Sequence, residues 1–99
     1  MEDIFIGYRD VIGILDIQGI EDYLKQGGAP EIYLLTRNPL SERVQSYLKE
    51  HLKEPQVTVI VTNSFRKTAA EIKQKNKGKG VRIEDLDEFG RRRFTYDVC

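Results

Sequence analysis

The chain has 99 residues, of which 39% are apolar and 32% charged, and its 16 basic side chains balance its 16 acidic ones. This length suits one domain with one modest core, and no apolar stretch approaches the roughly 20 residues of a membrane span. We therefore expect a single domain over residues 1–99, in the cytoplasm and without a signal peptide or membrane partner. Cys99 is the only cysteine, which excludes an internal disulfide framework.

The N-terminal third begins with a strand and continues with a segment that can be read in two ways. Residues 3–8 alternate apolar and other side chains, which predicts a strand. Apolar residues then recur at spacings of three and four, which predicts a helix over residues 10–26, although Gly13 and Gly19 weaken it. The alternative is a hairpin over residues 3–17 followed by a shorter helix.

Residues 31–63 define the fold class, because they read as a strand, a helix and a second strand. The strands, residues 32–35 and 57–61, are near-continuous apolar runs, as in central strands covered on both faces. Between them, apolar residues at helical spacing predict a surface helix with Asn38 as N-cap and Pro39 at its first position. This order favours a parallel pair joined by a right-handed crossover.

The C-terminal third predicts one more helix and two short strands. Asn63 or Ser64 can cap a helix that runs to about Asn76. Residues 81–84 and 94–98 alternate in the manner of strands, and we expect them to pair antiparallel. The predicted fold is therefore α/β: a mostly parallel sheet of four to five strands with helices packed on it and a C-terminal antiparallel strand pair.

The charge is distributed unevenly along the chain. Residues 1–63 carry 6 basic and 10 acidic side chains, whereas residues 64–99 carry 10 basic and 6 acidic ones. Such a concentration of cations is the electrostatic footprint of a polyanion partner, although a solvated helix face gives the same count.

Parallel central strands would also place two helix starts at one edge of the sheet. Backbone N–H groups and the helix dipole at such an edge favour phosphate, although the polar residues there can equally serve as helix caps. The predicted nucleic-acid-binding residues are Arg37, Arg66, Lys67, Lys73, Lys75, Lys77, Lys79, Arg91, Arg92 and Arg93.

Signals for catalysis are poor. His51, the only histidine, falls on the polar side of the second helix without a Ser or Cys nucleophile placed near it. Asp85, Asp87 and Glu88 fit an acidic turn better than a cation site, which needs several converging oxygens. We therefore expect no enzymatic activity, no metal and no cofactor, and we rank a small hydrolase or nuclease last.

Four stretches resemble, in their order, the small Toprim-domain proteins, which are related to the nicking domains of topoisomerases and primases. They are residues 5–11, 33–36, 61–67 and 83–86. The family pairs a glutamate with a glycine where this chain has Ile6 beside Gly7, and it places two aspartates where this chain has Arg37 and Pro39. The resemblance therefore implies a Toprim-like shell that handles nucleic acid without magnesium chemistry.

Two further resemblances are fainter. Residues 26–61 are similar to the DNA-coating Alba family in their order of elements, and the size and charged composition resemble small proteins of filamentous viruses that infect hyperthermophilic archaea. The high charged fraction also favours a thermostable protein.

The sequence as a whole favours a non-catalytic nucleic-acid-associated protein. The alternative is a protein-interaction module or homodimer, in which acidic and basic parts of two copies meet or an edge strand pairs across a two-fold axis.

Overall fold

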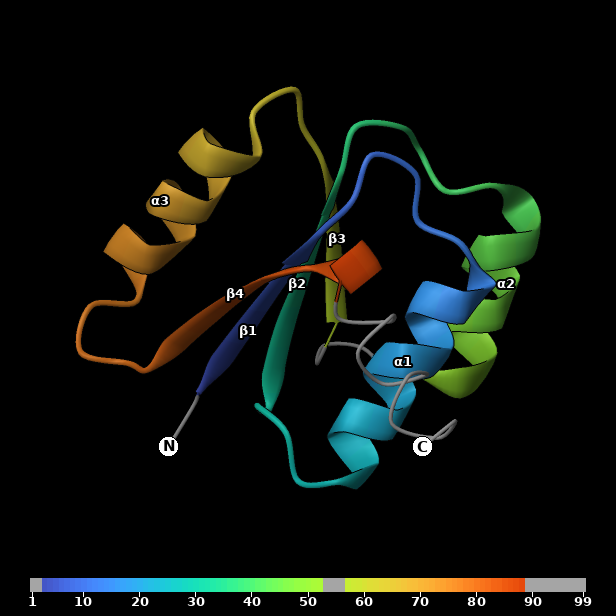
Figure 1. The fold of residues 1–99 in the computed structure, drawn as a ribbon, viewed down its shortest axis with the longest axis horizontal. Helices are drawn as coiled ribbons and strands as arrows, with labels where there is room; N and C mark the ends of the chain where they lie inside the picture. Colours follow the sequence, from blue (N-terminus) through green and yellow to red (C-terminus); the bar gives the residue numbers. More distant parts are fainter. Residues whose placement is uncertain (1–2, 53–56, 89–99) are drawn as a thin grey trace.

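The computed structural model describes residues 3–52 and 57–88, in which strands and helices alternate (Figure 1). The elements are β1 (Ile4–Tyr8), α1 (Ile14–Lys25), β2 (Glu31–Thr36), α2 (Glu42–His51), β3 (Val57–Val61), α3 (Phe65–Lys75) and β4 (Val81–Asp85). A short helical turn over residues 86–88 follows β4. This alternation confirms the predicted α/β class.

The four strands form one parallel sheet in the order β3-β2-β1-β4. In the register of this sheet, Ile6 of β1 lies opposite Tyr33 of β2 and Ile83 of β4. The predicted parallel pairing of β2 with β3 is confirmed. The chain steps outward from β1 to β3, and α3 then crosses the sheet to place β4 on the other side of β1.

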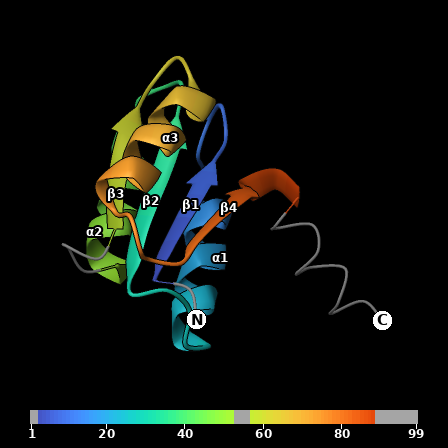
Figure 2. The same cartoon turned by 90° about the vertical axis from the view of Figure 1, so that its left-hand side faces the viewer.

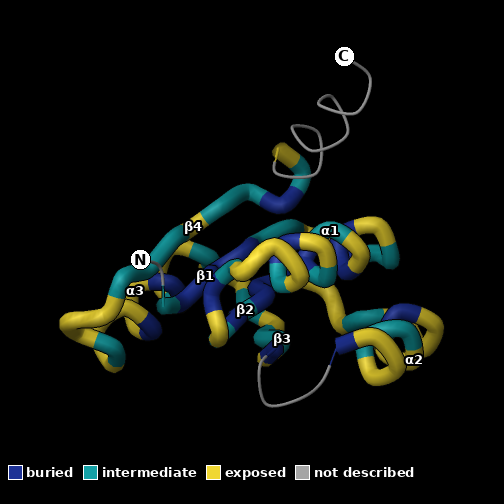
Figure 3. The backbone as a smooth tube through the Cα atoms, turned by 90° about the horizontal axis from the view of Figure 1, so that it is seen from below, coloured by how far each residue is buried: buried dark blue, intermediate teal, exposed yellow. Residues whose placement is uncertain are grey.

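The sheet carries helices on both faces, and α3 lies on the face opposite α1 and α2 (Figure 2). Consecutive strand residues point to opposite faces, so Phe5 packs with α1 while Ile4 and Ile6 pack with α3. Figure 3 shows the buried residues along the inner strands and exposed residues on the outer sides of the helices. The all-apolar start of β1 is thus explained by burial on both of its faces.

The ambiguous N-terminal segment is a loop followed by a helix, so the hairpin alternative is wrong. The helix begins at Ile14 rather than near residue 10, because Gly13 is its N-cap with an extended backbone. The Asp16 carboxylate accepts the Gly13 N–H at 2.8 Å, which fixes this start.

The second helix also begins later than predicted. Ser41 is the N-cap of α2, and its hydroxyl oxygen accepts the Val44 N–H at 3.3 Å. Asn38 and Pro39 therefore lie in the loop before the helix, and the predicted cap is wrong. The reason is tertiary, because the side chain of Asn38 donates to the backbone oxygen of Asp10 instead.

β3 is an outer strand and not the central one that its sequence predicts. Its last residue, Val61, is 54% exposed. An apolar run does not reveal whether a strand has one neighbour or two, since that depends on the order in which the chain lays the strands down.

Every strand pairing within residues 3–52 and 57–88 is parallel, including that of β4 with β1. The predicted antiparallel partner, residues 94–98, lies outside the described residues, as do Arg91, Arg92 and Arg93. In the described residues we find no helix that combines the length and the apolar character needed to cross a membrane.

Candidate nucleic-acid interface

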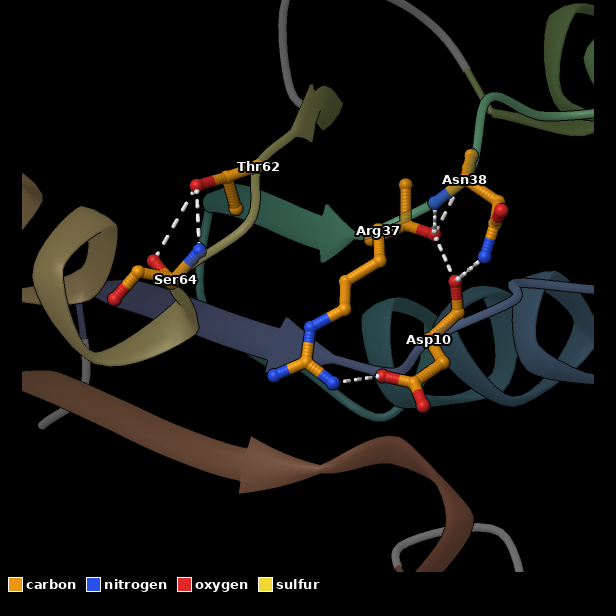
Figure 4. A network of polar contacts seen from close by, with 6 residues as sticks. Asp10, Arg37, Asn38, Thr62 and Ser64 are labelled. Carbon is orange, nitrogen blue, oxygen red and sulfur yellow. Dashed lines mark hydrogen bonds and ion pairs between the residues drawn. The ribbon is translucent and has the colours of Figure 1, made fainter.

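β2 and β3 end in matching threonine turns at the carboxyl edge of the sheet (Figure 4). The Thr36 hydroxyl oxygen accepts the Asn38 N–H at 3.3 Å, and the Thr62 hydroxyl oxygen accepts the Ser64 N–H at 3.2 Å. A hydrogen bond of 2.8 Å from the Thr62 N–H to the Thr36 carbonyl joins the two turns. The similar sequences at the two strand exits therefore have the same local structure.

Asp10, from the loop between β1 and α1, closes the exit of β2 (Figure 4). Its backbone oxygen accepts from the Thr36 hydroxyl at 2.8 Å and from the Asn38 side-chain amide at 3.0 Å. The same oxygen accepts the N–H groups of Arg37 and Asn38, each at 3.2 Å. The backbone donors that the sequence offers to phosphate at this exit are therefore engaged within the protein.

Arg37 is held in place at the same exit. Its guanidinium donates to the Asp10 carboxylate at 2.8 Å and lies over the Phe65 ring, 4.7 Å from the ring centroid. The carboxylate offsets its charge, so Arg37 is a weaker candidate for phosphate than its sequence position suggests.

Replacing Thr36 by valine is expected to lower the free energy of unfolding by about 1–2 kcal/mol. The Thr36 side chain is fully buried, and its hydroxyl joins Asp10 to the turn after β2. Thr62→Val is the matched control at the more open exit and is expected to cost about 0.5 kcal/mol. Urea denaturation measures both, and equal losses would contradict a special role for Asp10 in closing the β2 exit.

Six predicted contact residues lie on α3 and the turn after it, and we call them the α3 basic face. They are Arg66, Lys67, Lys73, Lys75, Lys77 and Lys79, and all six are exposed. Ala69 and Ile72 turn the other side of α3 toward the sheet. The only acid within residues 64–79 is Glu71.

The cations of the α3 basic face differ from Arg9, Arg37 and Arg82 in their partners. Within the described part of the chain, none of the six side chains forms an ion pair or a side-chain hydrogen bond. Arg9, Arg37 and Arg82 instead pair with Asp16, Asp10 and Glu84. The α3 basic face therefore offers six positive charges that are available to an external anion.

A groove of about 470 Å³ runs beside this face, and we call it the α3 groove. It is lined by Tyr8, Phe65, Arg66, Ala69, Ala70, Lys73 and Ile83. The rings of Tyr8 and Phe65 lie 5.3 Å apart, centroid to centroid. Sequence patterns do not point to Tyr8 or Ile83 as site residues, because the two come from separate strands that only the fold brings to one face.

The crevice between the ends of β1 and β4 has the opposite charge. Ligands of doubly wound sheets bind where the direction of the crossovers reverses, which here lies between β1 and β4. Asp10, Asp85 and Asp87 line this crevice together with Arg9. Arg9 is bound to the buried carboxylate of Asp16 at 2.9 Å.

The ion pair between Arg9 and Asp16 affects which ligands the crevice can bind. The hydrogen bond that Arg9 donates to Asp16 is the main reason that the pKa of Arg9 is raised. Arg9 also lies 3.8 Å from the Asp87 carboxylate, and the crevice is lined by three aspartates against this one arginine, which disfavours a phosphate. Asp16 also occupies the Gly13 N–H at the start of α1. Within residues 3–52 and 57–88, no three His, Cys, Asp or Glu side chains are placed to hold a metal ion.

His51 is a surface residue, as predicted. Its ring stacks on Tyr47 with a centroid separation of 4.0 Å, and its Nδ1 lies 3.3 Å from the Glu21 carboxylate. These contacts link α2 to α1 and give the ring a structural role between the two helices.

No family model, curated protein or solved structure matches this chain. The Toprim, Alba and viral resemblances therefore remain expectations that rest on short stretches of sequence. What the fold and the site define, over residues 3–52 and 57–88, is a class: a small α/β domain with a parallel four-stranded sheet and one exposed basic helix.

Proposed function

We propose that this chain is a non-catalytic nucleic-acid-binding protein that contacts phosphates through the α3 basic face. The observation that supports this most is the set of six exposed cations that have no partner among the described residues. Lysines and arginines of this kind bind phosphates and release the counterions condensed on a nucleic acid. Arg91, Arg92 and Arg93 remain part of the proposal as predicted further contacts.

The proposal assigns no reaction to this chain. Two of the carboxylates near the ends of the strands are engaged by arginines, Asp10 by Arg37 and Asp16 by Arg9. General acid–base or metal chemistry needs carboxylates that can contact a substrate or a metal ion, whereas these two form ion pairs with arginines of the same chain.

The test is a fluorescence anisotropy titration of labelled single-stranded and duplex DNA and RNA. If all six cations meet phosphates, affinity for a single strand should fall about 300-fold between roughly 50 and 200 mM salt. The absence of binding at the lower salt concentration, or binding that does not respond to salt, would remove the proposal.

A protein-interaction module or homodimer is the second candidate, and the edge of β3 favours it. β3 carries no charged residue, whereas the other outer strand, β4, contains Arg82, Glu84 and Asp85. Charged side chains protect an edge strand from pairing with another chain, and β3 lacks them. Sedimentation velocity discriminates, because a tight dimer that does not bind oligonucleotides would favour this candidate.

A further inference from the structure

The face of the sheet that carries α3 is only partly covered. Four strands spaced about 4.8 Å apart are wider than one helix with a diameter of about 10 Å. Among residues 3–52 and 57–88, the opposite face has two helices over it, α1 and α2, whereas this face has α3 alone (Figure 2). Ile83 of β4 is consequently 42% exposed, and it forms one side of the α3 groove.

Five of the seven residues that line the groove are apolar or aromatic. Tyr8 and Phe65 contribute their rings, and the guanidinium of Arg37 lies over the Phe65 ring, which fixes its orientation. Ala69 and Ala70 line the helix side, and their small side chains leave the groove open. The volume of about 470 Å³ falls within the range of sites that hold small flat ligands.

The other two lining residues, Arg66 and Lys73, are positively charged. Arg66 and Lys73 are seven residues apart, so they lie two turns apart on the same side of α3. Both are exposed, and neither has an ion-pair partner among the described residues. None of the described residues that line the groove is acidic. An aromatic surface next to two cations that have no ion-pair partner among the described residues matches the two parts of a nucleotide, its base and its phosphate.

We propose that the α3 groove binds one unstacked nucleobase of a single-stranded nucleic acid, while Arg66 and Lys73 bind the adjoining phosphates. This inference rests on the proposed function and names its substrate class. Aromatic side chains accept the face of any base, which makes such a site tolerant of sequence. A duplex keeps its bases stacked and must first extrude one at a cost of a few kcal/mol, so it binds this groove less well.

The charges around the groove also determine the path that a bound nucleic-acid strand follows. One end of the groove shares Tyr8 and Phe65 with the crevice that contains Asp10, Asp85 and Asp87, and this end repels phosphates. The α3 basic face continues from the other end to Lys79. A bound nucleic-acid strand therefore leaves the groove along α3 and the turn that follows it. A free mononucleotide is too short to contact the cations there.

Filling the groove without changing the charge tests this inference. Ala70→Leu adds an apolar side chain to the groove on an exposed helical position, and it is expected to weaken binding of a single strand of about 12 nucleotides about tenfold. Gln74→Leu, one turn further along α3 and outside the groove, is the matched control and should change affinity less than twofold. Circular dichroism verifies that both variants are folded.

Three probes separate the possible ligands. An abasic oligonucleotide of the same length should bind about tenfold less tightly than the normal strand, and a mononucleotide should bind at least 100-fold less tightly. Equal binding of abasic and normal strands by the wild-type chain, unaffected by Ala70→Leu, would overturn the base site but leave phosphate binding intact. A mononucleotide that binds as tightly as the strand would overturn the extended path. No binding of any probe at low salt would instead be a failure of the proposed function.

Discussion

Replacing Arg66 and Lys73 together by glutamate is expected to weaken single-strand binding by about 100-fold. Each substitution removes a phosphate contact and places a negative charge at the rim of the α3 groove. A loss of about 1.4 kcal/mol for each position gives this factor. The salt dependence should also become shallower, because two fewer counterions are released for each protein bound. Anisotropy titrations at several salt concentrations measure both quantities.

The chain provides a matched control for this pair on the opposite face of the sheet. Arg43 and Lys49 of α2 are also exposed, and their replacement by glutamate changes the net charge by the same amount. Binding through α3 predicts that this control keeps most of its affinity apart from a small long-range effect. If both double variants lost affinity equally, binding would depend on net charge alone and the α3 basic face would not be the site.

The largest effect on stability is expected at Gly28, where alanine should lower the free energy of unfolding by about 3 kcal/mol. A Cβ at this position would lie 2.4 Å from the ring of Tyr23. The ring has little freedom to move away, because it is buried, packs on Phe5 at 4.8 Å and accepts the Ala29 N–H on its hydroxyl oxygen. Relief of the clash must therefore displace the turn between α1 and β2.

Gly27→Ala is the control, because alanine at this neighbouring position would lower the stability through backbone strain and not through a clash. Gly27 has a φ of +83°, and a methyl group there would meet no atom within 4 Å, so alanine costs only backbone strain of about 1 kcal/mol. Urea denaturation compares the two variants. A Gly28→Ala variant as stable as Gly27→Ala would mean that the Tyr23 ring has room to shift.

The location of the free cations follows from how the layers are arranged. The two helices on one face are joined to the sheet through a large apolar cluster, whereas α3 contributes mainly Ala69 and Ile72 to its side. A helix that buries few residues has a wide solvent face, and on α3 that face is basic. The same thin coverage leaves the α3 groove beside it, so the cations and the aromatic surface have one structural origin.

The predicted anion site at the strand exits is an example of a feature that sequence patterns predict only in part. The sequence predicts two exits at one edge, and both are present at the ends of β2 and β3. The exit of β2 is nevertheless closed, because Asp10 from the first loop accepts its donors. Nothing near Arg37 in the sequence reveals this contact, since Asp10 precedes it by a whole helix and strand.

The sequence by itself determined the α/β alternation, a capped start of α3 at Asn63 or Ser64, of which Ser64 is the cap, and the concentration of cations on that helix. These features are local, because apolar periodicity and capping depend on residues within one or two turns. Only the tertiary structure decided that β3 is an outer strand, that Asp10 closes the β2 exit and that Tyr8, Phe65 and Ile83 line one groove. Strand order and the path of the crossover to β4 bring these distant residues together, and no short stretch of sequence encodes either of them.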